Sequence, residues 1–111
     1  MARAVIVAYR PKPDGQAKLL DLVRQHHPLL LAEKLITSRP PFVMQSKTGE
    51  VIEVFEWLSE MAIQDAHDNP RVQALWRDMA EVADTIPVAQ VTEAQSLFSE
   101  FSPLSLLRDD V

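Results

Sequence analysis

Two strand-like runs that are apolar on both faces constrain the fold of this chain most. Alternate side chains of an extended strand point to opposite faces of a sheet. Residues 4–10 therefore carry one apolar set on each face, namely Val5, Val7 and Tyr9 against Ala4, Ile6 and Ala8. Residues 51–57 repeat the pattern, with Phe55 and Trp57 opposite Ile52 and Val54. A sheet built on such strands needs cover on both faces, because soluble monomers rarely expose a whole apolar face.

Helical spacing begins after the first run. Residues 11–15 contain two prolines and a glycine and predict a turn, in which Asp14 is placed to cap a helix. Between residues 16 and 27 the large apolar side chains fall in one helical arc (Leu19, Leu20, Leu22 and Val23). Pro28 cannot continue the backbone hydrogen bonds, so we expect a kink or restart there, followed by another turn over residues 29–32.

The remaining elements complete a recognisable order. Residues 35–46 predict a second strand, which Pro40-Pro41 place at a sheet edge or in a bulge. Thr48-Gly49 predicts a hairpin turn into residues 51–57. Ser59 is expected to cap a helix that restarts at Asn69-Pro70, and residues 86–92 supply the last strand. The order β-α-β-β-α-β predicts an α+β, ferredoxin-like domain over residues 1–93, a four-stranded antiparallel sheet with two helices on one face.

Two helices cover only one face of this sheet, so the other needs a partner. A second copy of the chain is the simplest cover, and we expect a homodimer. Residues 94–111 form an apolar C-terminal extension, which we expect to pack on the domain or on the partner subunit. Its large side chains are too numerous for a solvated tail (Leu97, Phe98, Phe101, Leu104, Leu106 and Leu107).

Composition excludes several classes of function. Eleven basic against sixteen acidic residues give a net charge of −5, which argues against nucleic acid as a partner. The chain has no cysteine, and its two adjacent histidines lack the i, i+4 spacing of a helical metal clamp, so we expect no metal and no cofactor. With two glycines it has no phosphate-binding loop. Apolar runs such as residues 29–32 are too short to span a membrane, and the N-terminal residues lack the apolar core of a signal peptide, so a cytoplasmic protein is expected.

The histidines are the first candidates for chemistry. His67 lies at the edge of the apolar face of the helix predicted after Ser59, just before the break at Asn69-Pro70. It is expected to face a pocket between helices and sheet as a general base. The alternative is a histidine that only ties its ring to the helix end. His26 and His27 flank the first helical arc. We predict that His27 is a pocket residue, with a packed or capping histidine as the alternative.

A carboxylate and several aromatic side chains are the other candidates. Glu53 shares a strand face with apolar neighbours, whereas Glu56 lies on the opposite face. Burial of an unpaired carboxylate is costly, so we expect at least one of the two to form an ion pair with Arg10 or Arg39. The open alternative for Glu53 is a catalytic or orienting acid in the pocket. The aromatic residues could line a pocket for a flat apolar ligand or simply form the core (Trp57, Trp76, Phe55, Phe42 and Tyr9).

Two segments carry a resemblance to a known family. A strand ending in Glu56-Trp57-Leu58-Ser59, then a helix broken at Ala66-His67-Asp68-Asn69-Pro70, resembles the dimeric α/β-barrel superfamily, and within it the antibiotic-biosynthesis-monooxygenase-like proteins. The similarity covers about residues 3–93. It implies that two sheets pair across a two-fold axis into a barrel, with a pocket between sheet and helices. Some members are cofactor-independent monooxygenases of polycyclic aromatic compounds. Haem-degrading members carry an Asn-Trp-His set that is not matched here.

The sequence and this resemblance leave three functions open. The first is a cofactor-independent, monooxygenase-like enzyme for a small aromatic or carbonyl compound, with His67 as proton acceptor, Phe55 and Trp57 as walls and Glu53 as an orienting group. The second is a non-catalytic binding or stress-associated module, and the third is a structural homodimer with a filled pocket. A water-excluding cavity with converging polar groups would favour the first.

Overall fold

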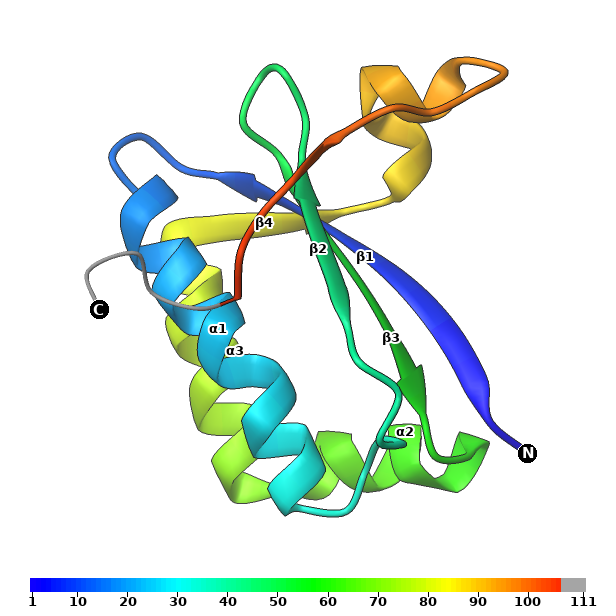
Figure 1. Cartoon of the computed structure of the whole chain (residues 1–111). Helices are drawn as coiled ribbons and strands as arrows, with labels where there is room; N and C mark the ends of the chain where they lie inside the picture. The colour runs from blue at the N-terminus through cyan, green and yellow to red at the C-terminus, as the bar shows by residue number, and fades with distance from the viewer. Residues whose placement is uncertain (107–111) are drawn as a thin grey trace.

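The computed structural model describes residues 1–106, whose strands form one antiparallel sheet (Figure 1). The strands are β1 (Arg3–Pro11), β2 (Phe42–Gln45), β3 (Val51–Trp57), β4 (Ala83–Ile86) and β5 (Ser102–Pro103). The α-helices are α1 (Gln16–Ala32), α2 (Glu60–Asp68) and α3 (Pro70–Val82), and two short 3-10 helices are η1 (Val88–Gln90) and η2 (Thr92–Gln95). This arrangement is an α+β fold, compatible with a ferredoxin-like one.

The sheet has the strand order β4-β1-β3-β2-β5, with the doubly apolar strands at its centre. The register pairs Val7 with Glu53 and Ala8 with Ile52 across β1 and β3. On its other side, Ala8 pairs with Ile86 of β4. The fifth strand, β5, was not expected; it is a short addition from the C-terminal segment beside β2. Helices α1 and α3 lie side by side on one face of the sheet (Figure 1).

The local signals around α1 are only partly met. Asp14 has a left-handed backbone (φ 63°) and does not cap the helix, whose N-cap is Gly15. A Cβ at Gly15 would lie 2.4 Å from the carbonyl oxygen of Val82, so close packing requires glycine here. The expected restart at Pro28 is wrong, because α1 continues to Ala32. Burial of Leu30 holds the helix together past the missing donor.

The helix caps predicted at Ser59 and Asn69 are confirmed, and so is the hairpin. Ser59 accepts a hydrogen bond from the N–H of Ala62, and the Asn69 side chain accepts from the first two N–H groups of α3 that can donate. Gly49 has φ 99° in the turn between β2 and β3, as a tight hairpin requires. In this hairpin Glu50 accepts hydrogen bonds from the hydroxyl of Ser46, from that of Thr48 at 2.5 Å and from Arg10 Nε at 3.2 Å.

Two predicted strands have different bounds. Only residues 42–45 of the segment 35–46 form a strand, because Pro40-Pro41 interrupt the pairing; Ile36 makes an isolated bridge to Trp57. The last strand spans 83–86 instead of 86–92. It starts directly where α3 ends, and Pro87, which has no N–H to donate, stops it.

The face of the sheet opposite the helices is covered at one end by the chain itself. Residues 87–101, which we call the strap, run from β4 toward β5 and bury Ala8 and Ile52 under Val91, Val88, Ala94 and Phe101. The other end stays open: Ile6 is 54% exposed and Phe42 57%. The expectation that a second copy must cover the whole face is therefore wrong for the end near Ala8, which the strap covers.

The C-terminal extension divides into packed and exposed parts. Phe101, the last residue of the strap, packs against the cluster of Ala8, Ile52 and Val91, whereas Leu104 and Leu106 contact the core between the sheet and α1 and α3. The N–H of Leu104 donates to Val43 at 2.8 Å, which extends the pairing of β5. Leu97 and Phe98 do not pack on their own chain, where they are 92% and 80% exposed, so their packing on a partner subunit stays a prediction. They lie in a loop after η2, so the expected helical spacing does not apply; Leu107 lies outside the described residues.

The helix-facing side of the sheet holds two continuous apolar clusters. One joins β1, β2 and β3 to α1 and α3, and the other joins the Trp57 end of β3 to α2 and to the start of α3. A cavity lies between them. In the described residues, no helix is long and apolar enough to cross a membrane.

Candidate functional site

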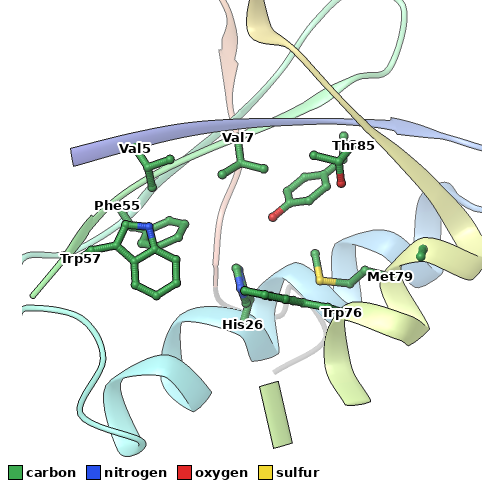
Figure 2. A pocket seen from close by; sticks show the side chains of 10 residues that line it. Val5, Val7, His26, Phe55, Trp57, Trp76, Met79 and Thr85 are labelled. Carbon is green, nitrogen blue, oxygen red and sulfur yellow. The ribbon is translucent and has the colours of Figure 1, made fainter. Parts of the chain in front are cut away.

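The cavity has a volume of about 290 Å³ and lies between the sheet and the helices α1 and α3. Figure 2 shows Val5, Val7 and Thr85 on the sheet side, facing His26, Trp76 and Met79 from the helices. Thr85 and Ala80 are exposed and mark its rim, whereas Phe55, Trp57 and His26 are buried. The lining is mostly apolar (Val5, Val7, Tyr9, His26, Phe55, Trp57, Trp76, Met79, Ala80 and Thr85). Its size and lining are typical of a pocket for one small apolar molecule.

Four of the aromatic residues considered as pocket walls belong to this lining, namely Tyr9, Phe55, Trp57 and Trp76. The rings of Phe55 and Trp57 meet edge to face, with centroids 5.2 Å apart, and form one wall. Trp76 forms part of the opposite wall, as a half-buried side chain of α3. Phe42 is not in the lining, because its position on β2 directs it to the other face of the sheet, where it pairs with Val54.

A chain of hydrogen-bonded polar groups joins three lining residues to Glu53 behind them; we call it the buried chain. Glu53, fully buried on β3, accepts a hydrogen bond from the hydroxyl of Tyr9 at 2.8 Å. Nδ1 of His26 lies 2.9 Å and 3.0 Å from its two carboxylate oxygens. Nε1 of Trp76 donates to Nε2 of His26 at 2.9 Å. Four residues from α3, α1, β3 and β1 are thus linked through the floor of the cavity.

The donors in the buried chain fix the tautomer of His26. An indole N–H can only donate, so Nε2 of His26 must present a lone pair to Trp76. The remaining ring proton is then on Nδ1 and points to the carboxylate of Glu53. A carboxylate that holds the Nδ1 proton leaves Nε2 as the basic atom of a neutral imidazole, which is the arrangement a general base requires.

Burial and the carboxylate of Glu53 hold Tyr9 in its neutral form. Burial, the negative charge of Glu53 and the hydrogen bond to it together raise the pKa of Tyr9 well above its ordinary value. No arginine or lysine contacts Glu53; among residues 1–106 its hydrogen-bond donors are the imidazole and the phenol. A buried carboxylate satisfied only by neutral donors is a candidate for function.

An ion pair, expected for at least one of Glu53 and Glu56, is confirmed for Glu56, whereas neither Arg10 nor Arg39 pairs with Glu53. Arg10 pairs with Glu50 and Arg39 pairs with Glu56, each with Nε 3.2 Å from a carboxylate oxygen. The reason is the alternation of β1, which directs Arg10 away from the helix-facing side of the sheet that carries Glu53. Glu53 itself contacts two lining residues without being part of the lining.

His67 lies outside the cavity, contrary to expectation. It is exposed on the last turn of α2, where its Nδ1 donates to the carbonyl of Ile63 at 2.8 Å. Its ring packs edge to face against the outer side of Trp76, with centroids 5.2 Å apart. The structure thus places His67 behind a cavity wall, with its ring fixed by the turn of helix that it ends.

His27 also lies outside the lining. It is rotated by one residue around α1 from His26, and its Nε2 is buried without a hydrogen-bond partner among residues 1–106. Burial lowers the pKa of His27, which a backbone hydrogen bond with Arg39 partly opposes. The candidate site histidine that sequence reasoning missed is His26. Its signal was present: it completes the spacing i, i+3, i+4, i+7 with Leu19, Leu22 and Val23, so it had to be buried.

The described residues also give no candidate for a metal site. Residues 1–106 contain no cluster of three or more histidine or acidic side chains that could hold a metal ion. The chemistry available at the cavity is therefore a neutral imidazole backed by a carboxylate, a phenol, an indole N–H and an apolar wall.

Comparison with known proteins supports the fold and is silent on activity. The structure of Rv0793 from Mycobacterium tuberculosis superimposes with a TM-score of 0.61 at 19% sequence identity, covering 78% of this chain and 94% of that chain. No protein-family model and no curated protein matches the sequence. At this identity, the likeness shows a shared fold only.

Proposed function

We propose that the protein is a cofactor-independent enzyme that binds a small aromatic or carbonyl compound and removes a proton from it. The observation that carries this proposal is the pair of Glu53 and His26 at the wall of an apolar cavity. The carboxylate orients the imidazole and stabilises the imidazolium that forms when Nε2 accepts a proton. The geometry favours His26 over His67 as the base, since only His26 lines the cavity.

The family resemblance suggests an oxidation step after proton removal. Dioxygen oxidises the electron-rich anion of a phenol or enol, and in a monooxygenase-like reaction a CH₂ group and O₂ give a carbonyl group and water. The cavity supports such a step because its apolar lining excludes water from the anion. No protein-bound redox group is needed for this balance.

A competing proposal is a binding module without turnover. It is favoured by one observation: both ring nitrogens of His26 are hydrogen-bonded to protein groups, so neither is free to act as a base. Under this proposal the cavity sequesters an apolar metabolite unchanged.

One experiment separates the two. The ligand that copurifies with the protein is identified by native mass spectrometry, and oxygen consumption is then followed with that compound and with a panel of hydroxy-aromatic and dicarbonyl compounds. Loss of a general base typically costs about 10²–10⁴-fold in rate, so we expect His26→Gln to lose at least 100-fold. His27→Gln, a change of the neighbouring histidine outside the lining, should keep the parent rate. Binding with no oxygen uptake and no product would refute the enzyme.

We also propose that the working unit is a homodimer built on the open end of the sheet. Ile6 and Phe42 are large apolar residues on that end, more than half exposed. The ion pair of Arg39 with Glu56 lies beside them on the same face and supplies a polar rim. A second copy of the chain, placed face to face, would bury this surface.

A further inference from the structure

The hydrogen bond from Trp76 occupies Nε2 of His26, which is the basic atom at the cavity. Both residues line the cavity, and their bond of 2.9 Å joins α3 to α1 across its floor. The lone pair of Nε2 is therefore directed to the indole and not to the cavity space. A ligand that is to meet this lone pair must first displace the indole N–H.

Of the two partners, Trp76 is the less buried, and we take it to be the one that a ligand displaces. His26 is 2% exposed, is held by both oxygens of Glu53, and packs edge to face on Phe55 with centroids 5.6 Å apart. Trp76 is half-buried, its indole makes this one side-chain hydrogen bond, and the exposed ring of His67 covers its outer side. Displacement of the indole disturbs the cavity rim, whereas displacement of the imidazole would break the buried chain.

A buried acceptor is expensive to leave unpaired, and this cost determines which ligands can open the bond. A ligand without a donor that pushes the indole aside would leave Nε2 of His26 unsatisfied. A ligand with an O–H or N–H group replaces one donor with another. A hydroxyl does more, because its oxygen can accept from the freed indole N–H while its proton is donated to Nε2.

We infer that Trp76 is a specificity-determining placeholder: its indole N–H occupies the position of the ligand's own donor, so the cavity selects hydroxyl-bearing ring compounds over isosteric ones without a donor. This inference rests on the proposed function, since it requires that the cavity binds a small molecule. It adds that the base becomes available only when a compound with a transferable proton is present.

Nuclear magnetic resonance can follow the placeholder directly. The chain has two tryptophans, so its spectrum contains two indole N–H resonances, and the resonance missing in Trp76→Phe identifies that of Trp76. The probes are 1-naphthol and 1-methylnaphthalene, which match in shape and differ in the donor. Contacts of either probe with the methyl groups of Val5 and Val7 report occupancy of the cavity independently of Trp76.

We expect 1-naphthol to shift the Trp76 indole resonance and the Nε2 resonance of His26 together, and to bind about 10-fold or more tightly than 1-methylnaphthalene. The methyl compound should contact the valines while both resonances stay in place. If 1-naphthol contacts the valines and the Trp76 resonance does not move, the placeholder is refuted and the proposed binding function stands. If both probes displace the indole equally, the requirement for a donor is refuted. Failure of both probes to contact the valines would overturn this inference and count against the proposed function as well.

Discussion

An alkaline titration tests the buried chain through Tyr9, which is the only tyrosine of the protein. Its ionisation can therefore be followed by tyrosinate absorbance without interference from other phenols. Burial, the charge of Glu53 and the hydrogen bond to it raise the pKa of Tyr9 well above 10 in the folded state. In the unfolded chain the phenol titrates near its ordinary value of about 10. Folded protein should consequently show no tyrosinate at a pH where unfolded protein in urea is largely ionised.

The same shift has a defined effect on stability. Because the folded pKa is the higher one, the contribution of Tyr9 is fully present below pH 10 and is lost as the pH rises from there toward the folded pKa. In this window the unfolded state has released one proton that the folded state keeps. The free energy of unfolding should then fall by about 1.4 kcal/mol per pH unit from this group alone.

Removal of the hydroxyl gives the magnitude at neutral pH. Tyr9→Phe keeps the ring in the core and removes one donor to a buried carboxylate, and hydrogen bonds to charged groups contribute about 1.5–3 kcal/mol. With about 2 kcal/mol lost, and an unfolding entropy of about 2.1 cal/mol/K for each of 111 residues, the melting temperature should fall by about 9 °C. The variant should also lose the alkaline slope.

Urea unfolding followed by circular dichroism, at several values between pH 7 and 12, measures both effects. Thr85→Val is the matched control, since it removes a hydroxyl from the exposed cavity rim at the position that pairs with Tyr9 in the sheet. This control should keep the parent stability and slope. A folded protein whose tyrosine ionises near pH 10, or a Tyr9→Phe variant with the parent slope, would refute the assignment of the buried chain.

Further predictions concern the hairpin, a helix cap and the open face. The hydrogen bonds that Glu50 receives in the hairpin hold its pKa at about 2, below the unfolded value of 4.5, so its stabilisation should be lost as the pH falls from 4.5 toward 2, and Glu50→Gln should flatten the stability profile in that range of acid urea melts. Ser59→Ala removes the N-cap of α2 and should cost about 1 kcal/mol, seen as a melting temperature about 4 °C lower, whereas an unchanged melting curve would contradict the cap. Ile6→Lys should convert a sedimenting dimer to a monomer, whereas Met61→Lys, at a comparably exposed apolar site on α2, should not; a parent protein that sediments at 12.5 kDa would refute the dimer.

Much of the fold could be predicted because local chemistry determined it. Ser59 and Asn69 cap helices through their own side chains, and Gly49 supplies the positive φ of the hairpin, so each signal acts within a few residues. The strap was not predictable in the same way. Its apolar residues follow neither a strand nor a helix period, and they are ordered by contact with the far face of the sheet.

The aromatic part of the site was predicted, because the positions of Phe55 and Trp57 follow the alternation of a strand. The hydrogen-bond partners of the polar residues were not predicted. Alternation along β1 already excluded Arg10 from the side of Glu53 and placed Tyr9 there. The helical arc of α1 had already placed His26, and not His27, toward the sheet. Glu53 and His26 are both polar residues at buried positions that face one another. Considered together, these two positions predict the hydrogen-bonded pair, which neither position predicts alone. The prediction for His67 was wrong because the end of α2, where this residue lies, is exposed.

The position of β1 inside the sheet, between β4 and β3, limits the order in which the protein can fold. The first strand to be synthesised has both neighbours far along the chain, since Arg3 pairs with Trp57 and Ala8 with Ile86. While α1 can form from local contacts, β1 must wait for β3, and its second edge stays unpaired until β4 emerges. Such long-range pairing slows folding relative to helical proteins of the same size. A growing chain that stops before Ala83 carries an open, apolar strand edge, which is the kind of surface that neighbouring chains add to.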